Sequence, residues 1–179
     1  MASGFGCMVV GPAGSGKSTL CNTIQEFAQM AGRTIKVCNL DPAAEIFKYK
    51  CDIDIRDLVS HDDVQEIENW GPNGGLVYCM EHLIEHIDWL TGELQEFSDD
   101  AFILFDCPGQ IELYSHLNVM QRLASALQTE GINLCSVYCA DGTQVNEPTK
   151  YVSGCLTSIS TMMQMGVPHL NVLTKCDKV

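Results

Sequence analysis

The chain has 179 residues, of which 46% are hydrophobic, and this length suits one buried core in a single domain over residues 1–179. The chain has ten Lys and Arg residues and 23 Asp and Glu residues, and the resulting net charge of −13 argues against direct binding to nucleic acid. No apolar run approaches the roughly 20 residues that span a bilayer, and no Lys or Arg precedes Lys17 as a signal peptide would require. We therefore expect a cytoplasmic protein with no membrane partner.

Hydrophobic periodicity predicts an alternation of strands and helices. Five apolar runs have the length of buried strands, at residues 5–10, 34–40, 101–105, 134–140 and 169–173. Helices are expected over residues 17–31, 76–94, 113–127 and 148–165. Residues from about 53 to 97 interrupt this rhythm as an insertion. The order predicts an α/β fold, a mostly parallel sheet with helices on both faces, and a ligand at the carboxyl ends of the strands.

A phosphate-binding loop follows the first predicted strand. Residues 11–19 have the sequence GPAGSGKST, a full G-x4-G-K-[ST] match between a strand and a helix. The glycines let backbone amides face a diphosphate, while Lys17 reaches the β- and γ-phosphates and the Ser18 hydroxyl binds Mg²⁺. The residues expected to bind the nucleotide here are Gly14, Ser15, Gly16, Lys17, Ser18 and Thr19.

A second motif, DCPGQ, begins at Asp106 directly after the third predicted strand. An Asp in this place can hold Mg²⁺ through water, and the Gly109 amide can sense a γ-phosphate. Gln110 and Glu112 then fall near the attacking water. D-x-P-G alone is also compatible with an ordinary turn, and the phosphate-binding loop is what favours the functional interpretation.

A third motif, Thr174-Lys175-Cys176-Asp177, follows the last predicted strand. The Asp177 carboxylate can accept hydrogen bonds from N1 and N2 of guanine, which adenine cannot donate, and the Lys175 stem can lie along the base. A lone T-K-x-D is usually a solvated strand end. Its position in a nucleotide-binding fold predicts that Thr174, Lys175 and Asp177 bind GTP rather than ATP.

With two further segments, these motifs resemble the GPN-loop GTPases. The segments are Gly71-Pro72-Asn73 in the insertion and Asn39-Leu-Asp41-Pro-Ala43 after the second strand. The resemblance covers all 179 residues and is nearest to the eukaryotic paralogue that heterodimerises with a sister GPN protein in RNA polymerase II assembly and nuclear import. It implies a P-loop NTPase fold with a GPN-loop insertion, and Mg²⁺-dependent hydrolysis of GTP to GDP and phosphate. It also implies a dimer with the sister protein or with itself, RNA polymerase II subunits as partners, and shuttling between cytoplasm and nucleus.

The resemblance also implies roles for individual catalytic residues. Asn73 would reach across the dimer to the phosphates in the partner's site, and Asp41 would orient or deprotonate the attacking water with Gln110 and Glu112 nearby. How these three divide that work is left open. Residues 57–121 contain fourteen acidic residues and no Lys or Arg, so this part of the chain holds no arginine finger. Any help with phosphoryl transfer must come from neutral donors such as the Asn73 amide. The acidic excess fits either a solvated face or a docking surface for a basic partner.

The chain ends two residues after Asp177, whereas the family continues, and we expect a C-terminally truncated member. The apolar faces of the helices at 113–127 and 148–165 should then lack cover. Two alternatives to a GTPase follow. One is a truncated partner-binding scaffold that no longer hydrolyses nucleotide, and the other is a related ATPase of the same fold.

Overall fold

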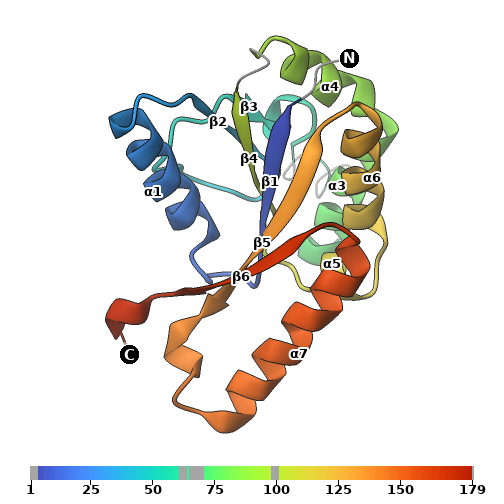
Figure 1. The fold of residues 1–179 in the computed structure, drawn as a ribbon. Coiled ribbons are helices and arrows are strands. Elements are labelled where there is room, and N and C mark those ends of the chain that lie inside the picture. Colours follow the sequence, from blue (N-terminus) through green and yellow to red (C-terminus); the bar gives the residue numbers. More distant parts are fainter. Residues whose placement is uncertain (1–3, 61–63, 65–70, 98–100, 179) are drawn as a thin grey trace.

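The chain forms a parallel sheet whose strands lie in the order β3-β2-β4-β1-β5-β6 (Figure 1). The computed structural model describes residues 4–60, 64, 71–97 and 101–178. Every strand pairing among these residues is parallel, which confirms the predicted fold class. The strands are β1 (Phe5–Val10), β2 (Ile35–Asn39), β3 (Ile53–Asp54), β4 (Phe102–Asp106), β5 (Asn133–Asp141) and β6 (His169–Thr174).

The short strand β3 is the one strand that the sequence did not predict. Its two residues pair with Cys38 and Asn39 at the edge of the sheet. Two residues are too few to show an alternating pattern, so periodicity could not identify them. The first residues of the predicted insertion therefore belong to the sheet, and Asp54 comes to lie beside Asn39.

Two of the predicted helices are divided in the structure. The pattern over 76–94 becomes α3 and α4, which meet at His86, whose backbone (φ −112°, ψ 38°) is not helical. The pattern over 113–127 becomes one short turn and a longer helix. The helix over 148–165 has the predicted bounds, and Gly166 ends it with a φ of 65°. The helices are α1 (Lys17–Met30), α3 (Pro72–Glu85), α4 (Ile87–Gln95), α5 (Glu112–Ser115), α6 (Val119–Thr129) and α7 (Pro148–Met165), with 3-10 turns η1 (Ile55–Asp57), η2 (Gly142–Gln144) and η3 (Cys176–Lys178).

Helices cover both faces of the sheet, but unequally (Figure 1). On one face, Val9 of β1 packs in a small cluster with Cys21 of α1. On the other face, Met8 and Phe105 belong to a larger core to which α3, α4 and α6 contribute. Because successive strand residues point to opposite faces, a single apolar strand such as β1 serves both cores. The sheet is thereby packed between helices on both of its faces.

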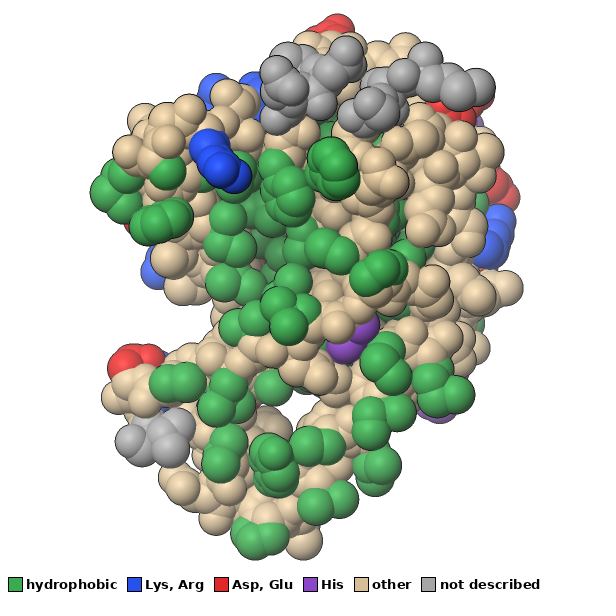
Figure 2. Space-filling view, viewed as in Figure 1, with side chains coloured by type: hydrophobic (Ala, Val, Ile, Leu, Met, Phe, Trp, Pro, Cys, Tyr) green, Lys and Arg blue, Asp and Glu red, His purple; other side chains and the backbone are tan. Residues whose placement is uncertain are grey.

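An apolar surface extends over α7 and β6. Leu156 and Met163 of α7 are 62% and 74% exposed, and Leu170 of β6 is 60% exposed; Figure 2 shows hydrophobic side chains gathered there. The expectation of an uncovered helix at 148–165 therefore holds. For the helix at 113–127 it is wrong, because α6 packs against α3 and β5. The buried residues of α6 are Val119, Met120, Leu123, Ala124 and Leu127.

The sheet reverses its direction of growth at β1, which lies between β4 and β5. Parallel strands end at a common edge, and ligands of such sheets bind where the strand order reverses. The loops after β1, β2, β4 and β6 carry the motifs singled out in the sequence. None of the described helices is both long and apolar enough to cross a bilayer.

Candidate nucleotide-binding site

The loop between β1 and α1 has a backbone that only glycine adopts without strain at three positions. Gly11, Gly14 and Gly16 have φ values of 139°, 73° and 97°. A Cβ on Gly11 would lie 2.7 Å from the Cys139 carbonyl oxygen and 3.0 Å from Ser15 Oγ. No side chain caps the amino end of α1, and no acidic residue lies in its first turn. The exposed amides and the helix dipole therefore suit an anion such as a phosphate group.

Lys17 lies within this loop rather than in solvent. Only 7% of the residue is exposed, and Nζ donates a hydrogen bond to the Pro12 carbonyl oxygen at 3.2 Å. The ammonium group is thus folded back over the loop that the sequence assigns to the β- and γ-phosphates. Ser15 Oγ is buried without a hydrogen-bond partner among the described residues, as expected in a loop shaped for a ligand. Of the predicted phosphate-binding residues 14–19, all but Ser15 line one cavity, described below.

Asp106 ends β4 beside this loop and is 3% exposed. Its Oδ2 accepts a hydrogen bond from the Tyr49 hydroxyl at 2.9 Å, while Oδ1 has no hydrogen-bond partner in the described part of the chain. Burial raises the pKa of Asp106, and the neighbouring Ser18 and Tyr49 hydroxyls and the Lys17 charge oppose that rise. An orphaned, buried carboxylate oxygen next to a hydroxyl fits Mg²⁺, which takes oxygen ligands. Ser18 and Asp106 would hold this ion.

Gly109 brings the loop after β4 into contact with the phosphate-binding loop. A Cβ at this position would lie 2.8 Å from Ala13 Cα and 3.0 Å from Lys17 Nζ. Gln110 follows half-buried, and its Oε1 has no hydrogen-bond partner among the described residues. Glu112 is exposed at the start of α5. Gly109 therefore brings the second motif into direct contact with the phosphate-binding loop.

Gly109→Ala should weaken nucleotide binding by roughly 5- to 150-fold, because overpacking by one methyl costs about 1 to 3 kcal/mol and here displaces Ala13 or Lys17. Titration with a fluorescent GTP analogue measures this. Gly92→Ala is the matched control, since a Cβ on Gly92 has no heavy atom within 4 Å. Equal affinity of the Gly109→Ala and parental chains would show that the contact does not shape the site.

Asn39 positions Asp41, a role that the sequence did not reveal. The Asn39 side chain is fully buried; its Nδ2 donates to the Asp41 carbonyl oxygen (3.0 Å) and to Asp54 Oδ1 (2.9 Å), and its Oδ1 accepts from the Asp41 amide (3.0 Å). Asp41 is half-buried, and Oδ1 accepts from the Ala43 amide. The Asp41 charge contributes to the raised pKa of Asp106, which places the two carboxylates near each other. In the sequence, an Asn at the end of an apolar predicted strand is the signal that could have identified this positioning role.

Arg56 anchors the segment that follows Asp41. It pairs with Asp54 (2.6 Å between Nη2 and Oδ2), donates to the Ala44 carbonyl oxygen (2.8 Å), and lies 4.6 Å from the Phe47 ring centroid. Burial alone would raise the pKa of Asp54, but hydrogen bonds from Arg56 and Asn39 hold it below its usual value. Arg56 is the last basic residue before the segment that lacks them. In this structure its guanidinium binds Asp54 and the Ala44 carbonyl oxygen and so stabilises the segment after Asp41.

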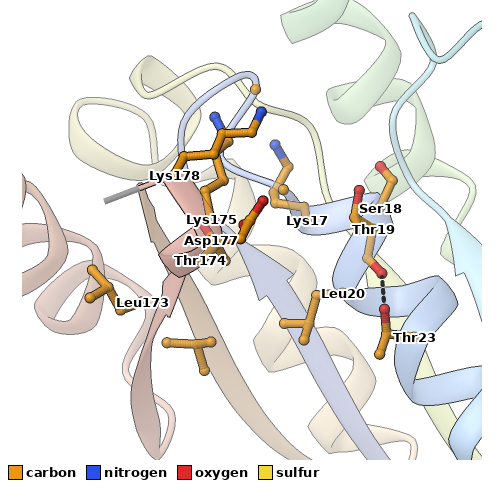
Figure 3. A pocket seen from close by; sticks show the side chains of 13 residues that line it. Lys17, Ser18, Thr19, Leu20, Thr23, Leu173, Thr174, Lys175, Asp177 and Lys178 are labelled. Carbon is orange, nitrogen blue, oxygen red and sulfur yellow. Dashed lines mark hydrogen bonds between the residues drawn. The ribbon is translucent and has the colours of Figure 1, made fainter. Parts of the chain in front are cut away.

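The third motif and the first line a cavity of about 630 Å³, a volume suited to a small-molecule ligand (Figure 3). Thr174 Oγ1 is 2.6 Å from the Ser15 carbonyl oxygen, so the end of β6 holds the phosphate-binding loop. Lys175, with an unusual φ of 54°, places Nζ 2.7 Å from Asp141 Oδ2. Asp177 lines the same cavity from η3 and is exposed. Thr174, Lys175 and Asp177 thus line one cavity. Asp141, which the sequence did not predict as a site residue, pairs with Lys175.

Lys175→Gln should raise the pKa of Asp141 from about 2 toward its ordinary value near 3.9, though not fully, because Thr143 still donates to it. A lowered carboxyl pKa stabilises the fold above the unfolded-state pKa, and this stability is lost as pH falls toward 2. The variant should therefore be less stable than the parent at neutral pH, with the gap narrowing below pH 4. Carboxyl NMR titration and denaturation at both pH values measure this, with the exposed Lys178→Gln as control. An unshifted Asp141 titration would refute the pairing.

A parallel sheet whose first strand leads through G-x4-G-K-S into a helix, with a buried Asp ending the adjacent strand, defines a P-loop nucleotide-binding protein. A family model described as "conserved hypothetical ATP binding protein" matches residues 9–179. With the relatives below, this match shows that the chain belongs to the GPN-loop GTPase family.

Two relatives carry the name GPN-loop GTPase 3. The chain is 50% identical over 170 residues to the one from Dictyostelium discoideum, covering 95% of this chain and 59% of that protein. It is 48% identical over 178 residues to the one from Saccharomyces cerevisiae, covering 99% and 65%. The chain therefore spans less than two thirds of either relative. Among solved structures, a GTPase in apo form from Pyrococcus abyssi matches with a TM-score of 0.82 and 26% identity, over 100% of this chain and 70% of that one.

Proposed function

We propose that this chain binds GTP with Mg²⁺ and forms the hydrolytic site of a GTPase that releases GDP and phosphate. The observation that carries the proposal is the cavity in which Lys17, Thr174 and Asp177 meet (Figure 3). A carboxylate in the place of Asp177 favours guanine over adenine. The names of the relatives and of the Pyrococcus abyssi protein support GTP, whereas the description of the family model names ATP.

The groups that bind the phosphates act mainly through charge and position. Lys17 and the amides at the start of α1 stabilise negative charge on the β- and γ-phosphates, in a loop that Thr174 fastens to β6. Ser18 and Asp106 would hold Mg²⁺, which neutralises phosphate charge when bound. Burial of Lys17 and Asp106 lowers the local dielectric and strengthens these interactions.

In hydrolysis, a water oxygen attacks the γ-phosphorus as its bond to the β,γ-bridging oxygen breaks, and GDP leaves. Asp41, held in place by Asn39, orients this water or takes its proton, with Gln110 and Glu112 as the other proposed contributors. Asn73 is exposed in the first turn of α3, where its amide can meet a second molecule. We propose that it donates to the phosphates of a partner.

We further propose that the protein works as a dimer with a sister GPN-loop GTPase or with a second copy. Its clients would be RNA polymerase II subunits, assembled in the cytoplasm and accompanied to the nucleus. The sequence resemblance to GPN-loop GTPases supports this part of the proposal, and the net charge of −13 agrees with clients that are proteins rather than nucleic acid.

Phosphate release from GTP and from ATP tests the proposal, with the purified chain alone and mixed with a sister subunit. We expect release from GTP that needs Mg²⁺ and disappears in Lys17→Ala. Preferred turnover of ATP would instead support the ATPase alternative. Tight GTP binding with no release in any mixture would support the scaffold that has lost hydrolysis.

A further inference from the structure

A cluster of metal-ligating side chains lies at the end of α3, outside the nucleotide-binding site. It consists of His82, Glu85 and His86, and each offers one ligand atom within 4.8 Å of the others. Residues three and four positions apart share one face of a helix, so this spacing points all three side chains to the same side. It is the one group of at least three His, Cys, Asp or Glu side chains so arranged in the described part of the chain.

The scaffold beneath the cluster is rigid while the ligands themselves are accessible. Met80 and Leu83 of the same helix are fully buried in the larger core, which fixes the orientation of α3. His82 is half-buried, and Glu85 and His86 are exposed. A tetrahedral ion with bonds near 2.1 Å needs ligand atoms roughly 3.4 Å apart. Small rotations of exposed side chains, which occur within nanoseconds, are enough to close that gap.

The imidazole of His86 contacts the backbone of α3 through one of its two ring nitrogens. Its Nδ1 lies 3.0 Å from the His82 carbonyl oxygen, a group that can accept a hydrogen bond from the ring. With Nδ1 in that contact, Nε2 is the ring nitrogen left to bind a metal ion. Metal-binding histidines almost always donate their other ring N–H to a carbonyl or carboxylate in this way. The rings of His82 and His86 also lie side by side, with centroids 4.1 Å apart.

The surroundings favour a cation. The cluster lies within the segment 57–121, whose fourteen carboxylates are accompanied by no Lys or Arg. Among the described residues, the exposed carboxylates Glu81 of α3 and Asp88 of α4 flank the cluster in the chain and favour a cation. Two imidazoles and one carboxylate suit Zn²⁺ and related transition-metal ions, whereas Mg²⁺ prefers oxygen ligands. The cluster should therefore discriminate against the ion proposed for the nucleotide site.

We propose that His82, Glu85 and His86 form a surface site for a divalent transition metal of the Zn²⁺ class. The three side chains supply three ligands, and a water molecule completes a tetrahedron. Because His86 lies where α3 ends and α4 begins, the bound ion ties the last turn of α3 to this junction. None of its three residues belongs to the proposed GTPase machinery, although Asn73 lies at the other end of the same helix.

Zn²⁺ titrated calorimetrically into the nucleotide-free chain tests this proposal. The parent for all variants carries Cys155→Ser and Cys176→Ser, which removes the two exposed thiols of the described residues as competing ligands. We expect one Zn²⁺ per chain, and at least roughly tenfold weaker binding in His86→Gln and in His82→Gln, by analogy with the cost of disturbing a metal's ligand set. Glu85→Gln should also weaken binding. His116→Gln, an exposed histidine of the same segment, is the matched control and should bind as the parent does.

Imidazole NMR provides an independent readout. Signals of His82 and His86 should shift on addition of Zn²⁺, while that of His116 stays in place. His86 is exposed, so His86→Gln leaves the core intact, and thermal melts without metal check this. Absence of Zn²⁺ binding by the parent, or parental affinity in both histidine variants, would overturn the proposal.

Discussion

Asp177→Ala should weaken GTP binding by about 10² to 10⁴-fold while leaving the weaker ATP binding nearly unchanged. The reason is the loss of two charge-assisted hydrogen bonds to guanine, together worth roughly 3 to 6 kcal/mol. Asp177 is exposed at the mouth of the cavity, so its removal leaves no buried partner unsatisfied and the fold should be unaffected. Competition of each nucleotide against labelled GTP measures both affinities.

Two further variants sharpen this test. Asp177→Asn should favour xanthine nucleotides, because an amide can donate to the oxygen that xanthine carries in place of the guanine amino group. Asp57→Ala removes an exposed carboxylate in η1 and should leave all affinities as they are. An unchanged preference for GTP over ATP in both Asp177 variants would refute the guanine assignment.

Asn73→Ala should lower kcat by about 10² to 10³-fold while nucleotide affinity stays nearly intact. If the Asn73 amide donates to charge that develops on the γ-phosphate, the contact strengthens only as the bond breaks, and its loss resembles deletion of a single oxyanion-type donor. The defect should appear only under conditions in which dimers form. Single-turnover hydrolysis at several protein concentrations measures it.

Mixed dimers decide whether Asn73 acts on its partner's site. One subunit carries Asn73→Ala and the other Lys17→Ala. If Asn73 acts across the dimer, the site of the Asn73→Ala subunit stays active, because its partner supplies the asparagine. If Asn73 acts on its own site, both sites are impaired. Asn118→Ala, another exposed asparagine at the start of a helix, serves as control. Parental turnover by the Asn73→Ala dimer, or a defect confined to the variant subunit's own site, would show that Asn73 does not act on the partner's site. Residues 71–73 would then be an ordinary turn.

The features that the sequence predicted well are those with a local signature. An apolar run such as 169–173 matches β6 to within one residue, and Pro148 and Gly166 mark the two ends of α7. The phosphate-binding loop is equally local, because its glycines and Lys17 are consecutive. Such local patterns predict the structure well because the same consecutive residues determine both the backbone conformation and the chemistry.

What the sequence could not predict depends on residues far apart in the chain. Tyr49 meets Asp106 across 57 positions, and Lys175 meets Asp141 across 34. Neither pair follows a spacing rule, since each arises only when separate loops end at one edge of the sheet. The division of 76–94 at His86 was missed for another reason, because its apolar residues keep a helical period across the break.

The most direct test of a guanine-nucleotide site is displacement of labelled GTP from the unmodified chain by unlabelled GTP and by ATP, with Mg²⁺ present. A site built around the Asp177 carboxylate should require at least about 10²-fold more ATP than GTP for half displacement, which corresponds to roughly 2.7 kcal/mol. Displacement by ATP at concentrations equal to or below those of GTP would contradict the central claim.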